Sequence, residues 1–183
     1  MQKNSIGLLE LSSVAAGMLV TDTMLKAASV ELLIHRTICS GKYLILVGGD
    51  VAAVEASVEA GRRAGGGAVI DSCAIANIDK AVFPAISGGV ILPPLAALGV
   101  IESFSVAALI EGADAAAKAA DVQLLEIRLA MALGGKAFVT LCGDVASVEA
   151  AVEAGAALVS ARGLLVNRVV IPAPSKEILR ESV

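Results

Sequence analysis

Residues 49–61 read GDVAAVEASVEAG, and residues 143–155 read GDVASVEAAVEAG. In each stretch an aspartate is placed to cap a helix that begins at the next residue, because its side-chain oxygen can accept a hydrogen bond from a backbone N–H of the first turn. In the first stretch this pattern predicts a helix over 51–64, which the glycine run 65–67 ends. The near-identity of the two stretches indicates that the chain contains the same element twice.

The repeat extends over most of the chain. Matching segments are 7–10 and 99–102, 22–28 and 114–120, and 49–61 and 143–155. The offset is 92 residues for the first two pairs and 94 for the third, so the second copy is longer by two residues in the turn that corresponds to the one around Cys39. We therefore predict two tandem domains, residues 1–80 and 97–183, joined by a linker over 81–96.

Each copy predicts the same order of elements. In the first copy we expect strands at 6–11, 30–34, 43–47 and 68–76, and helices at 14–28 and 51–64. The order βαββαβ indicates an α/β fold of the α+β sandwich type, with helices on one face of an antiparallel sheet.

The composition excludes several classes of protein. The 183 residues are 57% hydrophobic but only 2% aromatic and 17% charged, with a net charge of −4. Nucleic-acid binding is not expected, because basic patches with stacking aromatic residues are missing from the sequence. A membrane span is not expected either, since the longest uncharged stretch, 81–101, contains helix-breaking Pro84, Gly88 and Pro93. Scarce charge and abundant alanine favour surfaces that contact other subunits.

Residues that carry enzyme chemistry are sparse. His35 is the only histidine, and Cys39 lies four residues further along the same predicted strand and turn, about 13 Å away if extended. We therefore do not expect an enzyme. Of the three cysteines, Cys73 and Cys142 fall in predicted strands and are interpreted as buried, whereas Cys39 lies in a turn. One turn cysteine cannot hold a metal by itself, although three chains around a threefold axis would bring three thiolates together.

The repeated pattern resembles the bacterial microcompartment shell domain. The resemblance rests on the Gly-Leu/Val-Leu/Ile-Glu opening, the Asp-x3-Lys-Ala-Ala of the first helix, the Gly-Lys turn, the Gly-Asp-Val cap and the closing Ile171-Pro172. Both copies carry the pattern, so the chain is similar to tandem-domain shell proteins. This resemblance implies a homotrimer that imitates a hexamer, located in a microcompartment shell in the cytoplasm, with other shell proteins and possible enclosed oxidoreductases as partners.

The turn Thr37–Lys42 resembles the pore turn of the propanediol-utilisation type of these proteins. The resemblance implies that Cys39 from each of three chains is a ligand of one [4Fe–4S] cluster per trimer, which would transfer electrons across the shell. It also implies that Ser40, Gly41, Leu133 and Gly134 line the central pore. That type usually has a proline where this chain has Ser40, so we expect a less constrained backbone and an added hydroxyl there.

The resemblance also assigns contacts at the edge of the shell subunit. Lys26 and Lys118 match the edge lysine of the family, although each is also spaced to pair with an aspartate four residues earlier. The arginine and histidine that usually follow the closing Ile-Pro are replaced by Ala173 and Ser175. Edge contacts are therefore expected to depend on other groups, of which Lys26 and Lys118 are the first candidates.

Two alternatives remain open at this point. In the first, the shell subunit has no cluster, and the pore residues select small polar metabolites by size and hydrogen bonding. In the second, the chain is a free-standing regulatory α/β domain that binds a small ligand. The metal content of the protein distinguishes a cluster-free pore from a subunit with a cluster. The assembly state distinguishes a free-standing regulatory domain from a shell subunit.

Overall fold

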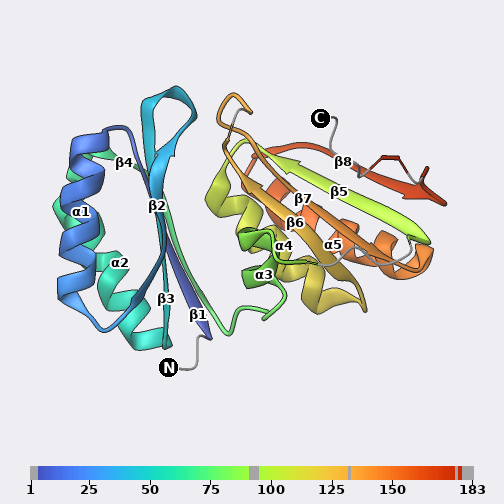
Figure 1. The fold of residues 1–183 in the computed structure, drawn as a ribbon, viewed down its shortest axis with the longest axis horizontal. Helices are drawn as coiled ribbons and strands as arrows, with labels where there is room; N and C mark the ends of the chain where they lie inside the picture. Colours follow the sequence, from blue (N-terminus) through green and yellow to red (C-terminus); the bar gives the residue numbers. More distant parts are fainter. Residues whose placement is uncertain (1–3, 91–94, 132, 176, 179–183) are drawn as a thin grey trace. The chain divides into compact units, whose positions relative to one another are not determined.

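A computed structural model describes residues 4–90, 95–131, 133–175 and 177–178. The first copy contains β1 (Ser5–Leu11), α1 (Val14–Ala27), β2 (Glu31–Ile38), β3 (Lys42–Gly49), α2 (Val51–Gly65) and β4 (Val69–Ala76). The second copy contains β5 (Ala97–Ser103), α4 (Val106–Ala119), β6 (Gln123–Leu129), β7 (Ala137–Gly143), α5 (Val145–Ala161) and β8 (Leu165–Pro172). The predicted order βαββαβ is confirmed in both copies (Figure 1).

The two sheets have the same topology. Their strand orders are β2-β3-β1-β4 and β6-β7-β5-β8, with antiparallel pairing throughout. Even the irregularities of pairing recur: the register shifts between Glu10 and Leu11 in the first sheet and between Glu102 and Ser103 in the second. The duplication seen in the sequence therefore extends to the register of the backbone.

In the first copy, α1 and α2 cover one face of the sheet (Figure 1). The core between them is aliphatic apart from one tyrosine, and consists of Leu9, Leu11, Val20, Met24, Tyr43, Ile45, Val47, Val54 and Val58. A Cβ at Gly17 of α1 would lie 2.3 Å from the Tyr43 ring, so the helix backbone rests directly on that ring. Small residues are what allow this close packing of helix on sheet.

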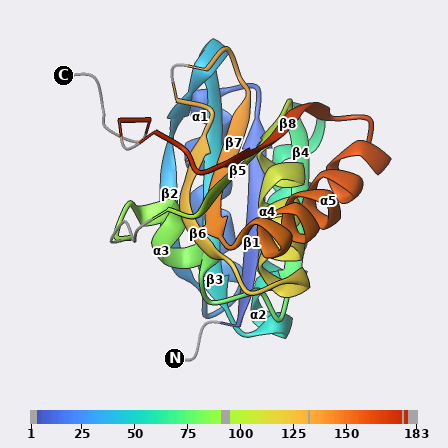
Figure 2. The same cartoon turned by 90° about the vertical axis from the view of Figure 1, so that its right-hand side faces the viewer.

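In the second copy, α5 packs on β5 and β8 (Figure 2). Both predicted helix caps are confirmed: Asp50 Oδ1 accepts from the Ala53 N–H at 2.9 Å, and Asp144 Oδ1 from the Ser147 N–H at 3.0 Å. The Ser147 hydroxyl also donates to Asp144, and these hydrogen bonds lower the pKa of the Asp144 carboxyl. Asp144 therefore stays ionised as the cap at a lower pH than an ordinary aspartate would.

Two elements differ from the sequence prediction. Strand β2 continues to Ile38 rather than ending at residue 34, because it pairs with β3 as far as Ile38 opposite Lys42. The predicted linker contains a short helix, α3 (Val82–Ser87), which contacts β6. Pro84 lies in its first turn, where a missing backbone N–H costs no intrahelical hydrogen bond. Among the described residues, none of the helices has the length and apolar character that a membrane span needs. Of the helix-breaking residues expected in the stretch 81–101, Pro93 lies outside the described residues.

Contacts divide the chain into two compact units. The first unit comprises Met1–Asp79 together with two segments of the second copy, Ser105–Ala107 and Ala130–Gly135. The other unit comprises Lys80–Phe104, Ala108–Leu129 and Lys136–Val183. The loop that follows β6 therefore belongs, by its contacts, with the copy that carries Cys39. The boundaries expected for the two domains and the linker stay a prediction.

Candidate functional site

Cys39 begins a tight turn between β2 and β3. Ile38, the last residue of β2, is buried, and Cys39 is partly exposed. Ser40 (φ 64°, ψ 27°) and Gly41 (φ 72°) then take left-handed backbone conformations in succession, which reverse the chain into β3. A Cβ at Gly41 would meet no atom within 4 Å. The turn therefore presents a thiol and open backbone at the tip of a rigid hairpin.

The conformation of Ser40 is consistent with the expectation drawn from its sequence. A serine in place of proline was expected to leave the backbone less constrained. At φ 64° the residue adopts a conformation that proline, fixed near −65°, cannot reach. Serine here permits a different turn.

Ser40→Pro is therefore expected to lower the melting temperature. If rearranging the turn costs about 2 kcal/mol, the melting temperature of a chain of this size falls by roughly 4–8 °C. Ser40→Gly is the matched control and should keep or raise it, because glycine adopts the left-handed conformation without a Cβ penalty. Thermal denaturation followed by circular dichroism compares the two; equal melting temperatures would contradict the expected strain.

The corresponding loop of the second copy reaches Cys39. The Cys39 N–H donates to the carbonyl oxygen of Ala130 at 3.1 Å. Along the same loop, Leu133 is half-buried, and Gly134 is exposed with a left-handed φ of 63°. The structure thus brings Cys39, Ser40 and Gly41 into one unit with the loop that carries Leu133 and Gly134. Whether these residues line a pore depends on other chains.

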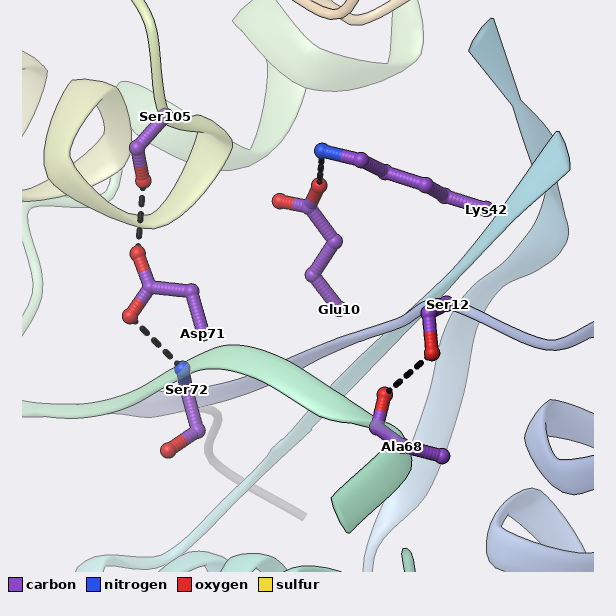
Figure 3. A network of polar contacts seen from close by, with 7 residues as sticks. All are labelled: Glu10, Ser12, Lys42, Ala68, Asp71, Ser72 and Ser105. Atoms are coloured by element: carbon purple, nitrogen blue, oxygen red, sulfur yellow. Dashed lines mark hydrogen bonds and ion pairs between the residues drawn. The ribbon is translucent and has the colours of Figure 1, made fainter. Parts of the chain in front are cut away.

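A buried ion pair stands beside the Cys39 turn. Lys42, the residue after Gly41, places its ammonium 2.7 Å from Oε1 of Glu10, whose side chain is only 4% exposed (Figure 3). In the second copy Lys136 pairs with Glu102 in the same way, at 2.5 Å. Each loop is therefore followed by a lysine whose charge a strand glutamate balances. The sequence pattern identified the lysine of the Gly-Lys turn but not its partner, although Glu10 and Glu102 recur at the repeat offset.

A second carboxylate lies opposite Glu10 in the sheet. Asp71 of β4 is the cross-strand partner of Glu10, an arrangement that is unfavourable when both charges lack partners. Here Asp71 accepts hydrogen bonds from the Ser105 hydroxyl at 2.7 Å and from the Ser72 N–H at 2.8 Å (Figure 3). The two carboxylates are thus directed to separate donors, Glu10 to Lys42 and Asp71 to Ser105 and Ser72.

The remaining cysteines and the histidine are occupied elsewhere. Cys73 and Cys142 are buried thiols, as predicted, and burial raises the pKa of the Cys142 thiol. A raised pKa disfavours the thiolate that metal binding requires. His35 Nδ1 lies 3.1 Å from the Tyr43 hydroxyl oxygen, so this imidazole has a partner other than Cys39. Across the described residues, no three His, Cys, Asp or Glu side chains lie together in an arrangement that could hold a metal ion.

Both copies of the repeated fold match one known protein family. The BMC domain model matches the chain twice, over residues 5–78 and 97–174. The chain belongs to the BMC domain family. Two BMC domains in tandem account for the shared register of the two sheets and for the matching positions of the two loops.

Individual relatives agree with this assignment. The chain is 43% identical to the bacterial microcompartment shell protein PduT of Citrobacter freundii, over 98% of this chain and 97% of that protein. A crystal structure of a microcompartments protein from Desulfitobacterium hafniense DCB is 52% identical, with a TM-score of 0.88 over 93% of this chain and 94% of the other. A fused permuted hexameric shell protein from the RMM microcompartment is 26% identical, with a TM-score of 0.65 over 85% and 83% of the two chains.

The expected edge lysines of the two BMC domains are both held in ion pairs. Lys26 contacts Asp22 and Lys118 contacts Asp114, each at 2.6 Å. The two pairs differ in exposure: the Lys26 side chain is 74% exposed and the Lys118 side chain 44%. The structure therefore bears out the helix ion pairs that the spacing predicted, and a role at a shell edge stays a proposal.

Proposed function

We propose that this chain is a non-enzymatic subunit of a bacterial microcompartment shell, that it assembles as a pseudohexameric homotrimer, and that three Cys39 side chains hold one [4Fe–4S] cluster. The shell role is supported by the BMC match in both copies and by identity to PduT over nearly the whole chain. These similarities favour a shell subunit, associated with other shell proteins, over a free-standing regulatory domain. Enclosed oxidoreductases would be partners in electron transfer.

The observation that carries the cluster proposal is the contrast among the three thiols. Cys39 alone is partly exposed, at the tip of a hairpin, whereas Cys73 and Cys142 are buried. Thiolate is the preferred ligand of iron–sulfur clusters, so the residues present fit the group. A cluster bound there would supply one-electron transfer. Among the described residues, no group of three His, Cys, Asp or Glu side chains could hold a metal ion, so this chain would contribute Cys39 and the other cysteine ligands would come from other copies.

The trimer is supported by a difference between the two copies. On α4, Ala107, Leu109 and Ile110 are fully buried. On α1, the residue that corresponds to Ile110 is Met18, and its side chain is 60% exposed. Met18 therefore exposes a large apolar side chain on α1. A second copy of the chain, seated on α1, would bury it, and three such contacts close a ring.

A cluster-free pore is the second candidate. It is favoured by the open space at Gly41 and Gly134, where an added Cβ would meet no atom within 4 Å. In that case Ser40, Gly41, Leu133 and Gly134 would present a hydroxyl and backbone amides to small polar metabolites. Cys39 would then be a thiol in the wall of the pore.

Iron and acid-labile sulfide, measured on protein purified without oxygen, test the cluster. We expect about four iron atoms per trimer, or roughly 1.3 per chain. Cys39→Ser should lose the iron while the trimer persists in light scattering. Cys73→Ala is the matched control and should retain it, since that thiol is buried in β4.

Two outcomes would count against the proposal in different ways. An intact trimer without iron, even after anaerobic reconstitution, would exclude the cluster and leave the pore. A discrete dimer or monomer that never forms trimers or sheets would exclude the shell assembly itself.

A further inference from the structure

Ala130 has an unusual backbone for its residue type. It follows β6 directly and adopts φ 51°, in the left-handed region that L-residues other than asparagine and aspartate seldom occupy. Its side chain is fully buried. A strained residue of this kind persists only when its surroundings determine its conformation.

The strain lies where the two copies diverge. By the repeat offset of 92, Ala130 corresponds to Ile38, the residue that ends β2, and Ile38 has an ordinary extended backbone with φ −126°. Beyond this position the second copy contains the two extra residues of its loop. The two copies therefore leave their second strands in different directions, and the left-handed Ala130 makes that difference.

The carbonyl of Ala130 is directed to one group. Ile38 and Lys42 are the last paired residues of β2 and β3, so the Cys39 N–H is the first donor beyond the ladder. It donates to the Ala130 oxygen at 3.1 Å. This hydrogen bond connects the start of the Cys39 turn to the loop of the second copy.

We propose that Ala130 is a positioning residue for Cys39: its left-handed backbone aims its carbonyl at the Cys39 N–H and so fixes the backbone from which the thiol projects. The consequence for a cluster rests on the proposed function, because a ligand residue whose backbone is held in the same place in each chain allows three thiolates to converge with less ordering. The positioning itself is a property of the single chain.

The first test measures the alkylation rate of the Cys39 thiol by iodoacetamide on cluster-free protein, across pH, with mass spectrometry to locate the label. Ala130→Val introduces a β-branched side chain that fits neither the buried site nor the left-handed backbone. We expect the rate at Cys39 to change at least fivefold, with a shift of its pH midpoint. Ala130→Gly keeps the carbonyl and suits the conformation, so it should react like the parent protein.

The matched control for strain alone is Ala173→Val. Ala173 is also a left-handed alanine, at φ 45°, but it is exposed and follows β8. Its variant should carry the same backbone penalty and leave the Cys39 rate within twofold of the parent. An Ala130→Val protein that folds and whose Cys39 rate and pH midpoint match those of Ala173→Val would overturn the proposal.

A second measurement needs no variant. Amide hydrogen exchange of the parent protein should show the Cys39 N–H protected, and an unprotected Cys39 amide would refute the proposal even if Ala130→Val fails to fold.

Iron content is measured independently of alkylation and exchange, so the cluster and the positioning role can fail separately. If no protein in the series binds iron, the cluster fails while the positioning role is still decided by alkylation and exchange. If the parent binds iron and the alkylation rates do not differ, the cluster stands and the positioning role fails.

Discussion

Replacing Gly155 with alanine is expected to lower the melting temperature by roughly 10 °C. Gly155 on α5 faces Gly112 on α4, and a Cβ at Gly155 would lie 2.5 Å from the Gly112 carbonyl oxygen and 2.7 Å from the Ile101 side chain. The nearest obstacle is helix backbone, which cannot turn aside as a side chain does. Separating the two helices costs about 3 kcal/mol, the upper end for an overpacked core.

The first copy provides the control. Gly61 occupies the position that corresponds to Gly155, but its added Cβ would meet the flexible end of Met24, with Cγ at 2.7 Å. Gly61→Ala should therefore cost markedly less, and Gly67→Ala, where no atom lies within 4 Å, almost nothing. Thermal denaturation of the three variants gives the order of their decreases in melting temperature. Equal decreases for Gly155→Ala and Gly61→Ala would show that the backbones of α4 and α5 move apart at little cost.

Met18→Glu is expected to dissociate the proposed trimer. If a second copy covers α1, Met18 becomes buried, as the matching residue Ile110 of α4 is. The substitution would remove the free energy gained by burying the methionine side chain. It would also place a carboxylate in the contact, where it loses water and gains no partner. A loss of about 3 kcal/mol at each contact weakens association by more than a hundredfold. Analytical ultracentrifugation over a range of concentrations measures the change.

Leu19→Glu is a sharp control for that experiment. Leu19 is as exposed as Met18, at 62%. Its counterpart in the second copy, however, is Glu111, which is not fully buried and pairs with Arg162. The partner of Glu111 has no counterpart in the first copy, where Ala68 stands, but a glutamate at position 19 should keep contact with solvent as Glu111 does, and the trimer should survive. Dissociation by both variants would point to a general intolerance of charge on α1, and dissociation by neither would place α1 outside the contact.

Much of the fold was predictable because the same sequence pattern occurs in both copies. Asp50 and Asp144 mark the same cap in each copy, and a chance match of so long a pattern is remote. The end of β2 was less predictable: residues 35–38 are largely exposed, so no hydrophobic alternation reveals that they pair with β3.

The candidate site was predictable in its residues but not in its backbone. Cys39 was singled out because the turn predicted an exposed thiol, and its partial exposure agrees. Neither the left-handed Ser40 nor the left-handed Ala130 has a sequence signature, since serine and alanine adopt such conformations only when long-range contacts impose them. The Glu10–Lys42 pair likewise joins residues 32 positions apart, beyond the range of local spacing rules.

The two loops differ, yet they belong to one polypeptide. The Cys39 turn and the longer loop that begins at Ala130 are therefore made in a ratio of one to one, whatever the level of expression. Separate chains carrying the two loops would combine at random and produce rings with every proportion of each. Covalent linkage removes that distribution, so every assembly of this chain has a single composition.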